Sequence, residues 1–208
     1  MKTFVATIAG VSPLLMHRFS DNNTEEMKAQ TRKINIMNVD PREAAEQCAY
    51  RTAEGYLYIP GEMPMRMLRE AGAAHKQRGS RRSLKYIISA VVWVLDRQIV
   101  LCDAEGNPIV DFEVDSRPVV IPSTKGRVIR HRPCINPPWF LEVPLEIDDS
   151  EIAPATVHDL LVEGGKKHGL GDYRPNTGGA FGKFQVHSWI ELGERVGPAV
   201  RTFAVAAE

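Results

Sequence analysis

The chain has 208 residues, and its 26 lysines and arginines balance 26 aspartates and glutamates, so its formal net charge is zero. A hydrophobic content of 43% and a charged content of 25% are ordinary for a globular protein, and the length suits one well-packed domain with room for a large insertion. No apolar stretch is long enough to span a membrane, and the N-terminus lacks the pattern of a signal peptide.

The first half of the chain predicts a strand, a helix, a short strand and a second helix. Residues 2–10 alternate and carry the β-branched residues typical of a strand. Residues 40–50 begin with Asp-Pro, which predicts a helix capped by the aspartate. Residues 56–60 predict the short strand, and residues 61–72 predict a helix that ends at glycine. The inward face of this last helix is expected to carry Met63, Met67, Leu68 and Ala71.

The second half predicts mixed structure. Residues 83–101 are apolar nearly all round, which favours a buried helix or a helix that passes into a strand. Short β-type runs follow. Residues 139–148 alternate as a strand, in which Pro144 indicates a sheet edge or a bulge. Residues 153–165 predict a helix closed by glycine, and residues 184–192 predict a last, regularly alternating strand.

Without its insertions, this order of elements is the βαββαβ order of a ferredoxin-like α+β fold. We expect one domain over residues 1–195, a tail over 196–208, and two insertions, over 18–50 and 97–138. Such a sheet leaves one face free, and RNA-recognition modules use this architecture. The fold alone does not decide the function.

The basic residues are concentrated in three segments. Residues 75–85, 125–132 and 164–184 together hold 13 of the 26 lysines and arginines but only one of the 26 acidic residues, Asp172. A basic track on an otherwise acidic body would attract a polyanion locally. Each run taken alone is more simply explained as a solvated loop. The hypothesis of a nucleic-acid partner therefore depends on all three.

The third segment contains a glycine-rich loop, GLGDYRPNTGGAFG, at 169–182. Glycines let backbone amides approach phosphate oxygens and form an anion-binding nest. Tyr173, which we expect to stack with Arg174, offers a surface for a base. The alternative is a mobile surface loop whose tyrosine packs back on the core. The loop is not a nucleotide-binding P-loop, because no Ser or Thr follows Lys183 and the next residues alternate like a strand.

Two segments resemble the RAMP superfamily, the RNA-binding subunits of CRISPR effector complexes. The stretch YIPGEMPMRMLREAG, at 58–72, is similar to the IPGSSLKGALR segment at the first helix of that superfamily, and the loop at 164–182 is similar to its glycine-rich loop. The resemblance implies a backbone-type subunit that assembles in repeated copies along a guide RNA, grips its phosphates and serves antiviral defence. It also implies a thumb or finger formed by residues 18–50 or 97–138.

We therefore predict a single-stranded RNA-binding subunit of a CRISPR-type ribonucleoprotein, without an enzymatic role. Its partners would be guide RNA, a complementary target, copies of itself and other effector subunits, with no membrane and no cofactor. The widely spaced Cys48, Cys102 and Cys134 favour reduced thiols, a cytoplasmic location and no metal site. The residues expected to contact nucleic acid are His17, Arg18, Arg66, Lys76, Arg78, Arg81, Arg82, Lys125, Arg127, Arg130, Arg132, Lys166, Lys167, Tyr173, Arg174 and Lys183.

Three other functions stay open. A phage-type single-stranded DNA-binding or annealing protein would use the same basic segments. An endoribonuclease would use His17 as acid or base together with a nearby aspartate, for which Asp21 and Asp40 are candidates. A scaffold protein would present its glycine loop to another protein.

Overall fold

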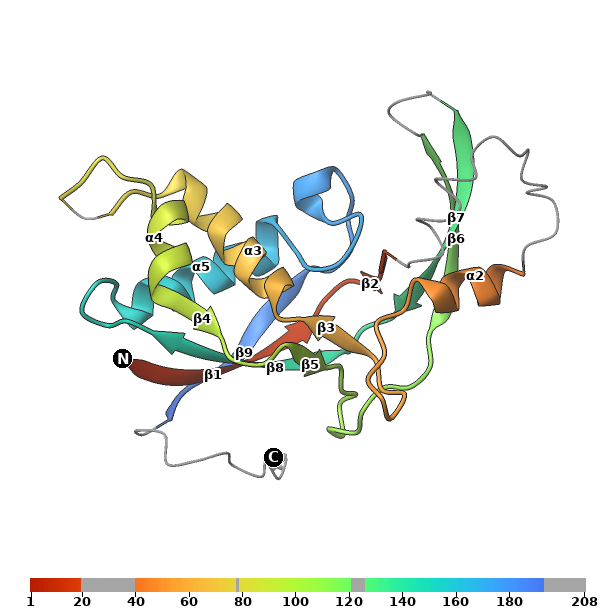
Figure 1. Cartoon of the computed structure of the whole chain (residues 1–208), viewed down its shortest axis with the longest axis horizontal. Helices are drawn as coiled ribbons and strands as arrows, with labels where there is room; N and C mark the ends of the chain where they lie inside the picture. The colour runs from red at the N-terminus through yellow and green to blue at the C-terminus, as the bar shows by residue number, and fades with distance from the viewer. Residues whose placement is uncertain (20–39, 78, 121–125, 193–208) are drawn as a thin grey trace.

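The core of the protein is a four-stranded antiparallel sheet with helices packed on one face, in a computed structural model that describes residues 1–19, 40–77, 79–120 and 126–192 (Figure 1). The core elements in chain order are β1 (Lys2–Gly10), α3 (Glu62–Ala71), α4 (Leu84–Val91), β4 (Val92–Val94), β8 (Phe140–Ile147), α5 (Pro154–Lys167) and β9 (Phe184–Leu192). The strands lie in the order β4-β8-β1-β9, and each neighbouring pair is antiparallel. The predicted α+β class is confirmed, and the arrangement is compatible with a ferredoxin-like βαββαβ fold.

Alternation along β1 directs one set of side chains into the core. Phe4, Ala6 and Ile8 are buried, while the residues between them are partly exposed. The helices cover this face, and Met67, Leu68 and Ala71 of α3 are buried as predicted. Met63 was expected among them but is only partly buried, and Pro64 is buried instead.

A smaller sheet lies beside the core and carries the β6–β7 hairpin, which extends away from it (Figure 1). Its strands, in the order β2-β7-β6, are β2 (Leu14–Leu15), β6 (Glu113–Val120) and β7 (Arg127–Ile135). The remaining elements are α2 (Pro41–Gln47), β3 (Tyr58–Pro60), β5 (Gln98–Val100) and the short 3₁₀ helices η2 (Gly72–Ala74) and η3 (Pro175–Thr177). Asp40 caps α2 as predicted, because its carboxylate accepts a hydrogen bond of 2.8 Å from the backbone N–H of Arg42.

Part of the first expected insertion, residues 20–39, lies outside the described residues, as do Arg78, Lys125 and the expected tail at 196–208. None of the helices that the structure describes has the length and apolarity needed to cross a membrane.

The two glycines near the end of α5 do not close the helix, as the sequence had predicted, because α5 continues through Gly164 and Gly165 to Lys167. A Cβ atom on Gly164 would lie 1.8 Å from the Sδ atom of Met67, and one on Gly165 would lie 2.4 Å from the carbonyl oxygen of Phe184. The glycines therefore serve close packing of α5 against α3 and β9.

The prediction that Pro144 marks a sheet edge or a bulge is wrong, since β8 lies between β1 and β4. Proline cannot donate a ladder hydrogen bond. Its carbonyl still accepts one from the N–H of Leu95, directly after the short β4 ends. The missing donor thus falls where the ladder stops.

The regular alternation expected along β9 is interrupted. The register against β1 shifts between Thr7 and Ile8, which leaves an extra residue on β9. Beyond the shift, Trp189 faces the helices. Its ring stacks on that of Phe4 at 4.9 Å and meets the ring of His158 edge-on at 5.4 Å. The sequence predicts Trp189 on the opposite face from Phe184, but Trp189 is partly buried and packs against the same core as the buried Phe184.

We expect Gly165→Ala to lower the free energy of unfolding by roughly 1–3 kcal/mol, because the new methyl group meets a backbone carbonyl that cannot move away. Urea unfolding would measure the loss. Lys166→Ala is the matched control, since Lys166 is exposed on the same helix turn. Equal midpoints for the two variants would contradict this account of the α5 glycines.

Candidate nucleic-acid interface

Backbone hydrogen bonds, within the loop and to residues 13–15, hold the glycine-rich loop in place. The N–H groups of Leu170, Asp172 and Gly182 donate to the carbonyls of Gly182, Leu15 and Pro13, at 2.7–2.9 Å. Further donors to protein acceptors are the N–H groups of Gly169, Thr177, Gly178, Gly179, Phe181 and Lys183. Most of the amides proposed for an anion-binding nest are therefore engaged, which contradicts that part of the prediction.

Arg174 joins the loop to α3 through a buried ion pair. Its side chain is 7% exposed, and its two terminal nitrogens donate to the carboxylate of Glu70 at 2.6 and 3.1 Å. Burial alone would raise the pKa of Glu70, but hydrogen bonds from Arg174 and Arg66 outweigh it and hold that pKa below its usual value. The expectation that Arg174 binds phosphate, or stacks on Tyr173, is thus corrected, since its donors are used inside the protein.

Asp172 joins the same loop to β7. The Nε atom of Arg132 lies 3.1 Å from the Oδ2 atom of Asp172, and Arg132 is only 4% exposed. The two atoms are close enough for an ion pair but are not aligned as a hydrogen bond, and both are buried without another aligned partner among the described residues. Arg132 therefore positions the loop, which corrects its expected role as an exposed phosphate ligand.

Tyr173 lies between these two ion-paired residues and has an unusual backbone. Its φ angle is +46°, in the left-handed region that non-glycine residues rarely adopt. Its side chain is 41% exposed. The ring lies 6.0 Å from that of Phe181, and the guanidinium nearest to it belongs to Arg117, 5.9 Å from the ring centroid. An exposed aromatic ring in a strained loop is a candidate binding residue.

One face of the β6–β7 hairpin carries Arg117, Arg130 and Arg132. Because Arg132 is buried against Asp172, we define the arginine face as Arg117 and Arg130 alone. Arg117 and Arg130 are directly paired in the strand register. Like charges opposite each other on one face of a sheet repel. The Nε atom of Arg117 donates to both carboxylate oxygens of Asp115, at 2.8 and 2.7 Å. Arg130 has no ion pair with any described residue, so it remains available to an anion.

His17 borders the arginine face. Burial lowers the pKa of His17, the carboxylate of Asp172 opposes this change, and Arg130 and Arg132 reinforce it. Its Nδ1 atom is buried and has no hydrogen-bond partner among the described residues. Next to it, Arg18 is exposed, and its backbone N–H donates to the carbonyl of Cys48 at 2.9 Å. The half-buried imidazole is therefore neutral at pH 7.

The other predicted residues are spread around the molecule. Arg127 is exposed on the opposite face of the hairpin from Arg130, and Lys167 pairs with Glu163 at 2.8 Å. The loop between η2 and α4, with the first basic segment, lies at the opposite end of the molecule from the hairpin (Figure 1). The candidates exposed or half-exposed there and near the end of α5 are Lys76, Arg81, Arg82, Lys166 and Lys183. The structure joins the second and third basic segments through Arg132 and Asp172. It joins the third to the start of the first through Glu163, which pairs with both Lys167 and His75.

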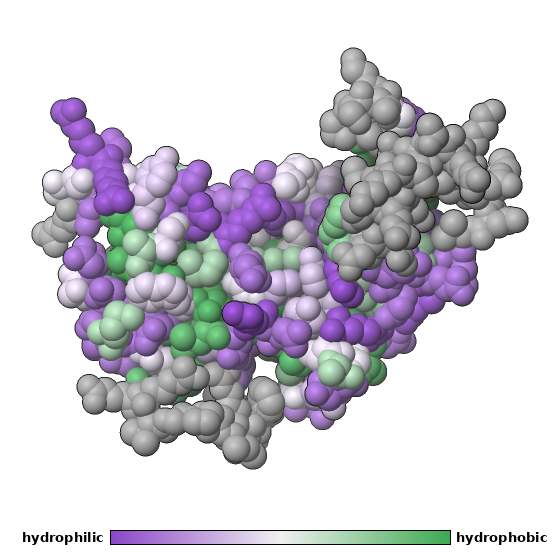
Figure 2. Space-filling model, in the orientation of Figure 1, coloured by the Kyte–Doolittle hydropathy of each residue, from purple (hydrophilic) through white to green (hydrophobic). Residues whose placement is uncertain are grey.

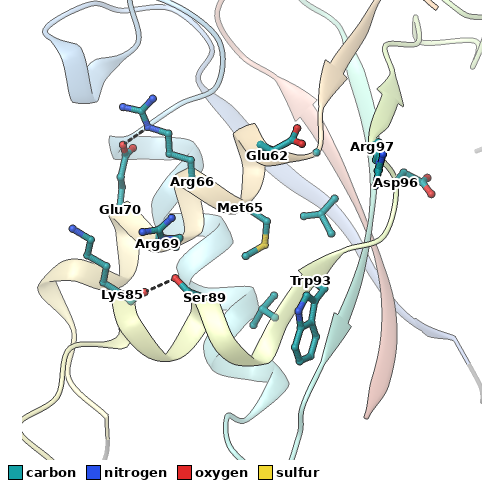
Figure 3. A pocket seen from close by; sticks show the side chains of 13 residues that line it. Glu62, Met65, Arg66, Arg69, Glu70, Lys85, Ser89, Trp93, Asp96 and Arg97 are labelled. Carbon is teal, nitrogen blue, oxygen red and sulfur yellow. Dashed lines mark hydrogen bonds and ion pairs between the residues drawn. The ribbon is translucent and has the colours of Figure 1, made fainter.

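Arg66 lies in a groove between α3, α4 and β4 (Figure 3). Hydrophobic surface shows in this part of the molecule (Figure 2), and Met65, Val92 and Val94 are among the lining residues. Both cations and acids line the groove, and Arg66 is paired with Glu70 at 3.0 Å. This mixed charge favours a polyanion less than the arginine face does.

Arg117 and Phe181 were not among the predicted site residues. The guanidinium carbon of Arg117 lies 4.5 Å from the centroid of the Phe181 ring, and this contact joins β6 to the glycine loop. Arg117 was missed because it stands alone in DSRPVV rather than in a basic run. Only the register that pairs it with Arg130 reveals it.

We expect Glu70→Gln to lower the free energy of unfolding by roughly 2–4 kcal/mol, because it leaves the Arg174 guanidinium buried without a counter-charge. Arg66→Gln is the matched control. Arg66 also pairs with Glu70, but its side chain is 70% exposed, so its loss costs less than about 1 kcal/mol.

The pH dependence of that difference follows from the lowered pKa of Glu70. The unfolded state takes up the proton first, so the stabilisation is complete above the ordinary glutamate pKa of about 4.3 and is lost as the pH falls through the lower value of the folded state. Thermal unfolding of wild type and Glu70→Gln over an acid pH series would measure it. A gap that stays constant into strong acid would contradict the assignment.

Comparisons with known proteins find little sequence similarity. No protein-family model matches the chain, and no curated protein matches it. The backbone is similar to a chain of a solved structure titled "Type IV-B CRISPR Complex", with 13% sequence identity over 97% of this chain and 95% of that chain, and a TM-score of 0.43. The function proposed below rests on the residues of this chain.

Proposed function

We propose that the protein is a single-stranded RNA-binding subunit of a CRISPR-type ribonucleoprotein, and that the arginine face with Tyr173 is its RNA contact. The observation that carries the proposal is the cross-strand pairing of Arg117 with Arg130. Two guanidinium groups held opposite each other are unfavourable by themselves and favourable when a phosphate lies between or above them.

The local charge supports a polyanionic ligand. Arg117 and Arg132 are paired with Asp115 and Asp172, whereas Arg130 has no ion pair with any described residue. The guanidinium of Arg130 is therefore open to an anionic ligand, although the whole chain is neutral. An exposed aromatic ring near a cation without an acidic partner suits single-stranded nucleic acid, whose bases stack while its phosphates are neutralised.

The hairpin itself suits the finger or thumb role that the RAMP resemblance implies for residues 97–138. It projects from the core (Figure 1). Val120 is 53% exposed and Ile129 is 61% exposed, on the face that also carries Arg127. Exposed apolar residues on a projecting hairpin favour contact with another subunit, in keeping with repeated copies along one RNA.

We expect Arg130→Ala to weaken binding of a single-stranded RNA by about tenfold at low salt, or ~1.4 kcal/mol. We also expect the slope of log affinity against log salt to fall by about 0.7, the contribution of one phosphate on a single strand. Fluorescence anisotropy across a salt series would measure both. Lys2→Ala is the control, since Lys2 pairs with Glu191 at 2.8 Å, away from the hairpin.

The same titrations separate the alternatives. Tighter binding of a single-stranded DNA of equal sequence would favour the DNA-binding or annealing protein over the RNA subunit. Salt-independent binding, or no binding of either polymer, would contradict the proposal and favour a protein scaffold.

Endoribonuclease activity is a second candidate, favoured by the environment of His17. A neutral imidazole with an unpartnered nitrogen, beside the carboxylate of Asp172 and two arginines, has the composition of a general base at a phosphate. Of the aspartates considered from the sequence, Asp40 caps α2 and Asp21 lies outside the described residues. Asp172 is the aspartate that the structure brings near His17.

If His17 is a base, His17→Ala abolishes a specific RNA product while RNA affinity changes less than twofold. Product formation in wild type would rise with pH through a pKa below the ordinary histidine value of about 6.5, because burial lowers that of His17. Gel analysis of labelled RNA over a pH series would test this. Equal product from both proteins would exclude His17 as the base.

A further inference from the structure

The aromatic pair Tyr173 and Phe181, together with Arg117, forms a layered unit whose outer member is exposed. Phe181 is 9% exposed and belongs to a small buried cluster with Leu15 and Cys134. Arg117 lies over the Phe181 ring at 4.5 Å, and Tyr173 adjoins both. Of the two rings, only Tyr173 is substantially open to solvent, at 41%.

We propose that this unit is a stacking platform for one unpaired nucleic-acid base, preferentially a purine, and that Arg117 is the residue that positions it. The inference rests on the proposed function and adds to it a base-contacting subsite, its positioning residue and its preference.

The guanidinium of Arg117 is held in place by the strand that carries it. The Nε atom of Arg117 is held by both oxygens of Asp115, so the plane of the guanidinium is set by the strand. A planar guanidinium stacks on aromatic rings, whereas the ammonium of lysine does not. Phe181 is anchored in turn, because its N–H donates to the carbonyl of Tyr173 at 3.3 Å.

The backbone of Tyr173 is held by close contact with Gly179. A Cβ atom on Gly179 would lie 1.6 Å from the carbonyl oxygen of Tyr173 and 2.8 Å from its Cγ atom, so that glycine admits the ring to its place. The φ of +46° and the close approach of Gly179 fix the backbone position from which the tyrosine ring projects. The backbone that presents the exposed ring is therefore pre-organised, which lowers the cost of ordering it when a base stacks.

The charge beside the platform defines the ligand. Arg130 is paired in register with Arg117 and has no ion pair among the described residues, so a phosphate can lie there while the adjoining base lies on Tyr173. A purine offers a larger stacking surface than a pyrimidine. The ligand class is thus a nucleotide unit within a single strand. Arg130 would bind its phosphate, and the platform would bind its base.

Three RNA 12-mers test the proposal: oligo(A), oligo(U) and an abasic ribose-phosphate chain. Wild type should bind oligo(A) tighter than oligo(U), and both tighter than the abasic chain by roughly 5- to 150-fold, the range expected for a stacked base. Tyr173→Ala should bind all three with the affinity of the abasic chain, and Tyr173→Phe should match wild type.

Arg117→Lys separates positioning from charge. It should weaken oligo(A) and oligo(U) binding at least threefold, while leaving the abasic affinity and the salt slope of all three probes unchanged, since the positive charge is kept. Arg130→Ala is the converse variant, because it removes a charge and leaves the platform intact. It should reduce the salt slope for all three probes and leave the ratio of oligo(A) to abasic affinity unchanged.

The outcomes are distinct. Wild type that binds RNA without any difference between oligo(U) and the abasic chain overturns the platform and leaves the proposed function standing. Arg117→Lys that weakens all three probes equally overturns the positioning role. Wild type that binds none of the probes overturns the proposed function itself. If Arg117→Lys fails to fold by circular dichroism, Phe181→Leu replaces it, because it removes the ring beneath Arg117 and keeps every charge.

Discussion

The two ion pairs of the glycine loop, Arg174 with Glu70 and Asp172 with Arg132, are the constraint on which the candidate site depends. Residues 172 and 174 would point to the same side of an extended strand. Here Asp172 reaches β7 and Arg174 reaches α3, and these two elements lie on different sides of the loop. The positive φ of Tyr173, between them, makes this possible. The same turn leaves the ring of Tyr173 exposed.

Much of the fold could be predicted because it depends on local periodicity. Alternation identified β1, and helical spacing identified the buried face of α3. The predictions fail where packing against a neighbouring element determines the local structure. Gly165 resembles a helix end until the carbonyl of Phe184 is seen against it, and Pro144 resembles an edge residue until the length of β4 is known. Both depend on packing across the sheet, which periodicity does not contain.

The candidate site was harder to predict, for the same reason. Composition identified the arginines of β7 and of the loop, but it could not tell which ones have acidic partners. Arg174 and Glu70 are 104 residues apart in the chain. Arg117 carried no signal, because its importance comes from a register partner and from Phe181. A basic run shows where cations are abundant, whereas only the fold shows which of them are neutralised.

That distinction explains how a chain with no net charge could bind a polyanion. Long-range attraction depends on total charge and is screened beyond about 8–10 Å at physiological salt. A neutral protein must therefore rely on contacts made at close range. In the loop and hairpin, Arg174 and Arg132 are used to set the geometry. Arg130, which has no ion pair with a described acid, lies directly opposite Arg117 in the strand register. Because the buried pairs are protected from salt while Arg130 is not, raising the salt concentration weakens the contact with RNA without dismantling the loop that forms it.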